Sequence, residues 1–228
     1  MEDLGCSIAA KAVIFDMDGL LLDSEKLSYQ TYVETAKSHG LDVDFDSYSV
    51  MIGLNMVEGI EVLRGILPAH IDPTIFKTKW IDAYLELLKD DVPVKPGIKD
   101  VIKGLAARNV PMAVATSSQG EKARDMLSRA GLARYMIAVT GGNEVARGKP
   151  APDVYLASIE RLRQATNIAG VNDCVAFEDS SVGVTAALAA GLRVIQVPDL
   201  IPATADAQPP FHLIADSLAM GVGWLQID

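Results

Sequence analysis

The chain has 228 residues, half of them hydrophobic and 22% charged, a composition typical of a soluble globular protein that can bury a substantial core. Asp and Glu total 30 and Lys and Arg total 20, so the formal net charge is −10. This acidic balance argues against nucleic acid or an anionic membrane as a partner. No apolar run reaches the roughly 18 residues that a membrane-spanning helix needs, and residues 1–10 lack the basic region of a signal peptide.

The cysteines and histidines predict neither a disulfide framework nor a zinc site. Cys6 lies in the N-terminal tail and Cys174 begins an apolar run. Two unrelated thiols without a targeting segment predict a reduced, cytoplasmic setting. His39, His70 and His212 are scattered, and none has a partner at metal-ligand spacing.

Five short apolar runs predict the strands of a parallel sheet. Continuous apolar runs of this length are typical of strands that are buried on both faces. Most of them are followed directly by polar or glycine residues. They cover residues 11–15, 110–115, 136–140, 174–177 and 193–197.

Helical segments alternate with these runs, at residues 98–109, 121–130, 152–163 and 181–190. Alternation of strands and helices implies right-handed crossovers between parallel strands. The sequence therefore predicts an α/β fold with a doubly wound, Rossmann-like parallel sheet.

The stretch between residues 24 and 91 breaks this alternation, because it shows helical patterns and no convincing strand. We expect an amphipathic helix over 25–39, with Ser24 as its N-cap and Gly40 as its stop. Further helices are expected over 56–67 and 73–89.

We interpret this stretch as an inserted all-α cap domain. The predicted division is a helical cap at residues 24–91 and an α/β core domain made of residues 1–23 and 92–228. The two links would lie near 22–25 and 90–97, and the second contains Pro93, Pro96 and Gly97, a composition typical of a linker.

Two acids follow the first predicted strand, as Asp16-Met17-Asp18-Gly19. Side chains two positions apart on an extended segment point the same way, so both carboxylates converge at the carboxyl end of a buried strand, where open α/β sheets bind ligands. Such close like charges favour a cation between them, and Mg²⁺ prefers oxygen ligands and shares its coordination sphere with phosphate. A surface turn that happens to be acidic is the alternative.

Polar groups also follow three other predicted strands. Glu178 and Asp179 could complete a metal site, although Asp179 or Ser180 could equally cap the next helix. Thr116-Ser117-Ser118 could cradle phosphate oxygens, and Lys149, flanked by prolines, could neutralise a phosphoryl group. Each feature alone is weak, but together the four strand ends supply every group that phosphoryl transfer needs.

In these motifs the chain resembles the haloacid dehalogenase-like hydrolase superfamily, in the branch with a helical cap after the first strand. The first motif is matched by Asp16-Met-Asp-Gly-Leu-Leu-Leu-Asp23 and the second by Thr116. Lys149 within Lys-Pro-Ala-Pro-Asp153 matches the third, and Glu178-Asp-Ser-Ser-Val-Gly183 matches the fourth. The motifs occur in order and span nearly the whole chain.

The resemblance implies a phosphatase that works through an aspartyl-phosphate, with Asp16 as nucleophile and Asp18 as general acid and base. It implies Mg²⁺ held by Asp16, the Asp18 backbone carbonyl and Asp179, with Glu178 near that shell. Thr116, Ser117 and Lys149 are the expected phosphate-binding residues.

Three other functions compete with a phosphatase. Dehalogenases of this superfamily generally lack the second acid, so Asp18 and the acids at 178–179 argue against that activity. Mutases that resemble β-phosphoglucomutase keep all four motifs, but they carry His and Arg where this chain has Ser28 and Met56, which cannot hold a second phosphate. A non-catalytic binding protein on the same scaffold is disfavoured because the motif residues are intact.

The cap is expected to set substrate choice. Asn55, Glu58 and Lys79 are its polar candidates, and Arg64 or Lys79 could supply a cation in place of the missing Arg. The resemblance indicates a sugar phosphate or a related small phosphomonoester as substrate. We expect a monomer or a weak oligomer.

Overall fold

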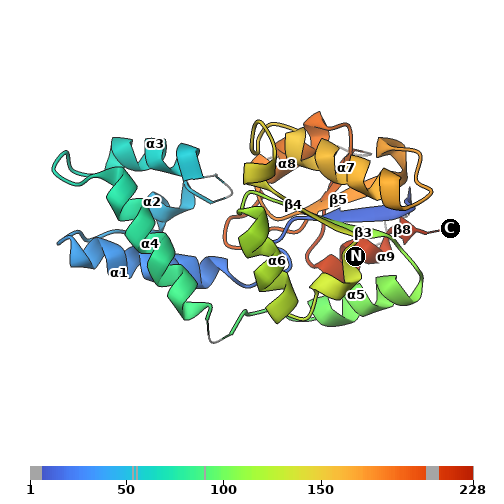
Figure 1. Cartoon of the computed structure of the whole chain (residues 1–228), viewed down its shortest axis with the longest axis horizontal. Coiled ribbons are helices and arrows are strands. Elements are labelled where there is room, and N and C mark those ends of the chain that lie inside the picture. Colours follow the sequence, from blue (N-terminus) through green and yellow to red (C-terminus); the bar gives the residue numbers. More distant parts are fainter. Residues whose placement is uncertain (1–6, 53, 55, 90, 204–210, 228) are drawn as a thin grey trace.

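The computed structural model describes residues 7–52, 54, 56–89, 91–203 and 211–227. Helices α1 to α4 lie together at one end of the molecule, and the sheet with its covering helices forms the other end (Figure 1). The predicted fold class, a parallel α/β core with a helical insertion after the first long strand, is confirmed.

The main sheet has six strands in the order β4-β3-β2-β5-β6-β7, and every neighbouring pair is parallel. All five predicted strands are present. The short strand β7 was not predicted, nor was the separate parallel pair of β1 and β8. The strands are β1 (Ile8–Ala9), β2 (Ala12–Phe15), β3 (Met112–Thr116), β4 (Ala138–Gly141), β5 (Cys174–Glu178), β6 (Arg193–Gln196), β7 (His212–Ile214) and β8 (Leu225–Gln226).

Helices cover both faces of the main sheet, which explains why its central strands β2, β3 and β5 are almost entirely apolar. Successive side chains of a strand point to opposite faces. Val13 and Phe15 of β2 therefore pack into one core cluster, whereas Ala12 and Ile14 pack into another. The first cluster includes residues of α5 (Ile98–Ala107), α6 (Gly120–Arg129) and α9 (Leu218–Gly223), and the second includes residues of α7 (Asp153–Ala165) and α8 (Ser181–Ala189). Short 3₁₀ turns cover Ala133–Tyr135, Gly142–Glu144 and Val171–Asp173.

The insertion has its own aromatic core. Tyr32, Tyr48, Phe76 and Trp80 are buried together, and the ring centroids of Tyr32 and Trp80 lie 5.1 Å apart. Its described residues form helices and no strand, as predicted. They are α1 (Glu25–Ser38), α2 (Phe45–Ser49), which is short and was not predicted, α3 (Met56–Ile66) and α4 (Pro73–Leu87).

The two links to the insertion lie side by side. The Asp23 N–H donates to the Pro93 carbonyl at 2.9 Å, and the Lys95 N–H donates to the Leu21 carbonyl at 3.1 Å. The chain therefore enters and leaves the insertion at one place. The domain boundaries themselves, after residue 23 and before residue 92, stay a prediction.

Ser24 occupies the N-cap position of α1, but its side chain does not cap the helix as predicted. Its backbone is already helical, with φ −87° and ψ −24°, whereas a capping side chain needs an extended backbone at this position. The Ser24 hydroxyl instead donates to Asp18 Oδ1 at 2.8 Å. A residue expected to begin a helix thus contacts the candidate active site.

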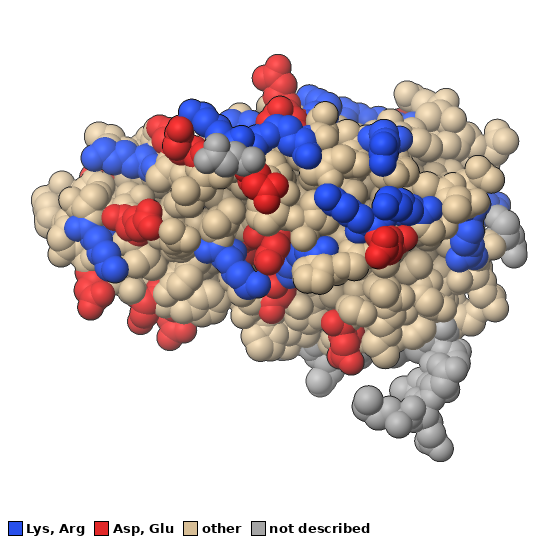
Figure 2. All heavy atoms as spheres, turned by 90° about the horizontal axis from the view of Figure 1, so that it is seen from below, with Lys and Arg blue, Asp and Glu red and all other residues tan. Residues whose placement is uncertain are grey.

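None of the helices in the described ranges is both long and apolar enough to cross a membrane. Basic and acidic side chains are interspersed on the face shown in Figure 2. Cys174 is a buried free thiol, and burial raises its pKa to about 12. Cys6 lies outside the described residues.

Candidate active site

The candidate site lies at the carboxyl ends of β2 and its two neighbours. β2 is central in the sheet, between β3 and β5, so the residues that follow these three strands share one edge. Asp16 follows β2, Thr116 ends β3, and Glu178 ends β5. All three are buried. The sheet thus brings together residues that are far apart in sequence.

Lys149 joins two of these strand ends through its ammonium group. Its Nζ donates to Asp16 Oδ1 and to Glu178 Oε1, each at 2.6 Å. The Tyr155 hydroxyl of α7 also donates to Glu178 Oε1. Burial disfavours the charged form of Lys149, but the Asp16 and Glu178 carboxylates outweigh it and raise the Lys149 pKa. Lys149 is therefore a fixed positive charge beside Asp16.

Three buried carboxylates could hold a metal ion. Asp16, Glu178 and Asp179 each offer an oxygen, and these oxygens lie within 4.8 Å of one another. Within the described part of the chain, Glu178 Oε2 is buried and has no hydrogen-bond partner. Burial raises the pKa of Asp16 and of Asp179 well above the usual range, the Glu178 carboxylate raises both further, and Asp16 also raises the pKa of Asp179.

This donor set fits a hard divalent cation. The single Lys149 ammonium cannot neutralise three carboxylates, and all the available donors are oxygens. A cation would offset the charge that burial makes costly. The cluster agrees with a divalent metal site and does not by itself distinguish Mg²⁺ from other hard cations.

Two glycines allow the acids to pack this closely. Gly19 has φ +81°, and a Cβ built on it would lie 2.3 Å from Asp179 Oδ2. A Cβ on Gly183 would lie 2.0 Å from Glu178 Oε2. Gly19 thus provides the space that the Asp179 carboxylate occupies.

Asp18 lies near this cluster, but its carboxylate is held by other groups. The Ser24 hydroxyl donates to Oδ1 and the Ser118 hydroxyl donates to Oδ2, each at 2.8 Å. The two serines come from opposite sides, one from the start of the helical insertion and one from the turn after β3. They fix the orientation of a carboxylate that lies at the edge of a cavity.

The three hydroxyl residues at the end of β3 and in the turn after it have different surroundings. Thr116 is buried, and its Oγ1 accepts the Ser118 N–H at 3.0 Å. Ser117 and Ser118 line the cavity. Thr116 thus braces the turn, and the next two residues face the cavity.

A cavity of about 320 Å³ lies between the helical insertion and the core. Asp18, Ser117 and Ser118 lie on its core side, whereas Ser28 and Met56, the two positions that separate this chain from mutases, line it from the insertion. Glu25 and Lys77 also line the cavity, and neither was predicted from the sequence.

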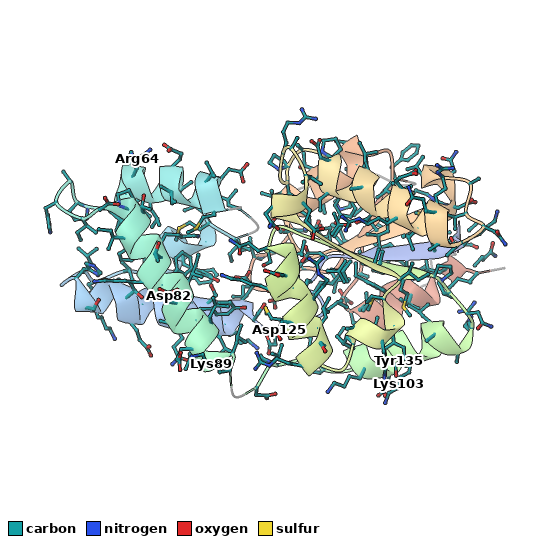
Figure 3. All side chains as sticks on the ribbon, in the orientation of Figure 1. Arg64, Asp82, Lys89, Lys103, Asp125 and Tyr135 are labelled. Atoms are coloured by element: carbon teal, nitrogen blue, oxygen red, sulfur yellow. The ribbon has the colours of Figure 1, made fainter. Side chains whose placement is uncertain are left out.

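Glu58, Arg64 and Lys79, three of the polar cap residues expected from the sequence to meet the substrate, do not line this cavity. Lys79 is exposed, and Arg64 pairs with Glu61 on the outer part of α3, away from the core (Figure 3). Glu58 lies elsewhere on α3, and Asn55 falls outside the described residues. To identify Lys77 and not Lys79 as a cavity residue from the sequence, one would need to know which face of α4 turns toward the core.

Comparison with known proteins agrees with this geometry. A family model described as haloacid dehalogenase-like hydrolase matches residues 13–197. The chain is 33% identical to a phosphorylated carbohydrates phosphatase of Thermotoga maritima over 81% of this chain and 83% of that protein. It is 34% identical to a fructose-1-phosphate phosphatase of Escherichia coli over 81% of this chain and 95% of that protein.

Solved structures show the same architecture. CbbY from Rhodobacter sphaeroides, in complex with phosphate, superposes with a TM-score of 0.74 at 25% identity, covering 92% of this chain and 95% of that one. β-Phosphoglucomutase from Clostridium difficile has a TM-score of 0.72 at 20% identity, covering 91% of each chain, and shows the fold alone.

Proposed function

The chain belongs to the haloacid dehalogenase-like hydrolases, and from this membership we propose that it is a Mg²⁺-dependent phosphatase of a sugar phosphate or a related small phosphomonoester. The observation that carries the proposal is the position of Asp16, buried against Lys149 within a cluster of carboxylates and next to the cavity that Asp18 lines. Relatives that are phosphatases of phosphorylated carbohydrates support the substrate class.

The metal would be held by Asp16, Asp179 and the Asp18 backbone carbonyl, with Glu178 beside them. When bound, Mg²⁺ supplies positive charge that lowers the repulsion between the Asp16 carboxylate and the phosphoryl oxygens. Lys149 supplies a second positive charge, because its Nζ donates to Asp16 Oδ1. Thr116, Ser117 and Lys149 bind the phosphoryl group, Thr116 acting through the turn that it braces.

The reaction proceeds in two displacements at phosphorus. A carboxylate oxygen of Asp16 attacks, the bond from phosphorus to the ester oxygen breaks, and the Asp18 carboxyl gives its proton to that leaving oxygen. Asp18 then takes a proton from water as the water attacks the aspartyl-phosphate. Inorganic phosphate leaves and the Asp16 carboxylate is restored. Ser24 and Ser118 hold Asp18 in place for both proton transfers.

Hydrolysis is favoured over transfer to a second sugar because Ser28 and Met56 line the cavity where a mutase needs groups that bind a second phosphate. Ser28 carries no charge and Met56 cannot pair with phosphate. Intact Asp16, Asp18, Lys149 and Asp179 speak against a non-catalytic binding protein. We place the enzyme in the reduced cytoplasm, as a monomer or weak oligomer, with residues 24–91 as the cap.

The test is to incubate the enzyme with Mg²⁺, β-glucose 1-phosphate and a trace of the 1,6-bisphosphate. We expect release of inorganic phosphate without interconversion of the 1- and 6-phosphates, and no release in excess chelator. Rapid formation of glucose 6-phosphate with little free phosphate would identify a mutase. Full activity in chelator would contradict the metal requirement.

A further inference from the structure

Glu25 and Lys77 line the cavity from the helical insertion, and neither takes part in the chemistry described above. We propose that they form a matched acceptor and donor for hydroxyl groups on the uncharged tail of the substrate. Lys77 donates to one oxygen, and Glu25 accepts a hydrogen bond from the next hydroxyl. The inference rests on the proposed function and names the substrate class: phosphomonoesters with a polyol or sugar tail.

The position of Lys77 allows its ammonium group to bind a ligand. Its side chain is only 7% exposed, and among the described residues its ammonium has no hydrogen-bond acceptor and no carboxylate within 4.0 Å. Nζ lies 4.2 Å from the centroid of the Trp80 ring, which supports the charge without using its N–H donors. Because Lys77 lines the cavity, its ammonium can donate to an oxygen that a ligand supplies.

The protein also leaves space for this ammonium. Gly59 of α3 faces Lys77, and a Cβ built on Gly59 would lie 2.7 Å from Nζ. Any larger residue at position 59 would displace the charged group from its place above Trp80. The position of the Lys77 ammonium therefore depends on a residue of a different helix.

Glu25 presents the complementary acceptor. The Tyr48 hydroxyl donates to its Oε2, which anchors the carboxyl group, and the residue lines the cavity. Burial of the Glu25 carboxyl raises its pKa to about 7, and burial of Lys77 lowers its pKa to about 8. Near neutral pH the cavity thus contains a large fraction of ionised Glu25 together with protonated Lys77.

This pair suits hydroxyl groups better than a second anion. A hydroxyl both donates and accepts, so neighbouring hydroxyls satisfy a carboxylate and an ammonium at once. A second phosphate or a carboxylate could pair with Lys77, but Glu25 would repel it, and Asp82 of α4 also lines the cavity (Figure 3). Met56 and Ser28 add no positive charge.

The experiment compares six-carbon substrates that differ only in the tail: sorbitol 6-phosphate with hydroxyls, hexyl phosphate without them, and 6-phosphogluconate with a distal carboxylate. We expect wild-type kcat/KM to be highest for sorbitol 6-phosphate. In Lys77→Met and in Glu25→Gln, the ratio of kcat/KM for sorbitol 6-phosphate to that for hexyl phosphate falls roughly 10- to 100-fold, as expected for a lost hydrogen bond to a charged group.

Lys79→Met is the matched control, because Lys79 is exposed on the same helix two positions away. It should keep the wild-type ratio. Gly59→Ala leaves every charge in place but displaces the Lys77 ammonium, so it should lower the ratio as well. Thermal melting checks that each variant is folded, and Lys77→Met keeps the apolar contact with Trp80.

The outcomes separate this inference from the proposed function. If wild-type enzyme with Mg²⁺ releases phosphate from none of the three substrates or from an aryl phosphate, the phosphatase assignment fails. If it hydrolyses them and folded Lys77→Met keeps the wild-type ratio, the pairing of Glu25 and Lys77 with hydroxyls is wrong. A preference for 6-phosphogluconate that Lys77→Met removes would overturn the polyol tail in favour of an anionic one.

Discussion

Lys149 Nζ lies 2.6 Å from Asp16 Oδ1, although 133 positions of sequence separate the two residues. Both side chains are buried, and the same ammonium also binds Glu178. A buried charge that has lost its partner is strongly destabilising. The ion pair that positions the proposed nucleophile is therefore also part of what holds the strand ends together.

We predict that Lys149→Met destabilises the metal-free protein by about 3–5 kcal/mol, because it leaves Asp16 and Glu178 buried without their cation. Arg147→Met is the control. Arg147 is largely exposed and pairs with Asp153 at the surface, so its loss should change stability by about 0–1 kcal/mol. Urea unfolding measures both, and equal effects of the two substitutions would show that the Lys149 contacts add no stability.

Gly19→Ala should abolish activity. The residue has φ +81°, and the new Cβ would lie 2.3 Å from the Asp179 carboxylate, which must move out of the metal cluster. Gly40→Ala is the control, because Gly40 has a similar φ of +73° but no atom lies within 4 Å of a Cβ built on it. This variant should lose only about 1–2 kcal/mol of stability through backbone strain and keep full kcat/KM. Comparable activity in the two folded variants would mean that the close approach of Gly19 to Asp179 is unimportant.

Stabilisation by Mg²⁺ should increase with pH. Burial, together with Asp16 and Glu178, raises the pKa of Asp179, so the folded metal-free protein holds a proton that the unfolded chain has released. Its stability therefore falls as pH rises from the ordinary carboxyl pKa toward the raised value. A cation displaces this proton and removes the penalty.

Melting temperatures with and without Mg²⁺, in acidic and in mildly alkaline buffer, measure this effect. We expect a larger Mg²⁺-dependent rise at the higher pH. Asp179→Asn should lose most of the rise at both, while its metal-free form is at least as stable as wild type. A rise that is independent of pH, or one that survives in Asp179→Asn, would place the metal elsewhere.

The pH profile for a polyol phosphate should depend on Glu25. Burial raises the Glu25 pKa to about 7, Asp18 and Asp199 raise it further, and Tyr48 and Lys77 lower it. The Glu25 carboxyl group accepts a stronger, charge-assisted hydrogen bond from a substrate hydroxyl once it has lost its proton. We therefore predict that the kcat/KM for sorbitol 6-phosphate, divided by that for hexyl phosphate, rises through about pH 7 and falls above about pH 8 as Lys77 deprotonates. Glu25→Gln should remove the rising limb, and an unchanged limb would exclude Glu25 from substrate recognition.

The core fold and the clustering of acids at its strand ends were predictable because local and global patterns agree there. A parallel strand that is covered on both faces must be apolar throughout, so β2 and β5 stand out in the sequence, and the acids at their ends mark the edge where ligands bind. Right-handed crossovers restrict how these strands can be connected, but the strand order itself was not predicted from the sequence. Strand β7, with three residues, is too short to give such a pattern.

The cavity residues of the insertion could not be predicted in the same way. Lys77 and Lys79 both lie in α4. The periodicity of the helix does not show which of its sides faces the α/β core. Ser24 carries the sequence pattern of a helix cap, but the Asp18 carboxylate accepts its hydroxyl instead. Both contacts depend on how the insertion is placed against the core, which local sequence does not encode.

The most direct test of the account follows a radiolabelled phosphoryl group through a single turnover with excess enzyme, stopped rapidly by acid. With wild-type enzyme and Mg²⁺, we predict that the label passes from the substrate to a covalent acyl-phosphate on Asp16 and then to inorganic phosphate. Asp16→Asn should carry no label and release none. Covalent label in folded Asp16→Asn, or release of inorganic phosphate by wild type with no labelled protein at any time, would contradict the assignment of Asp16 as the nucleophile of a phosphatase.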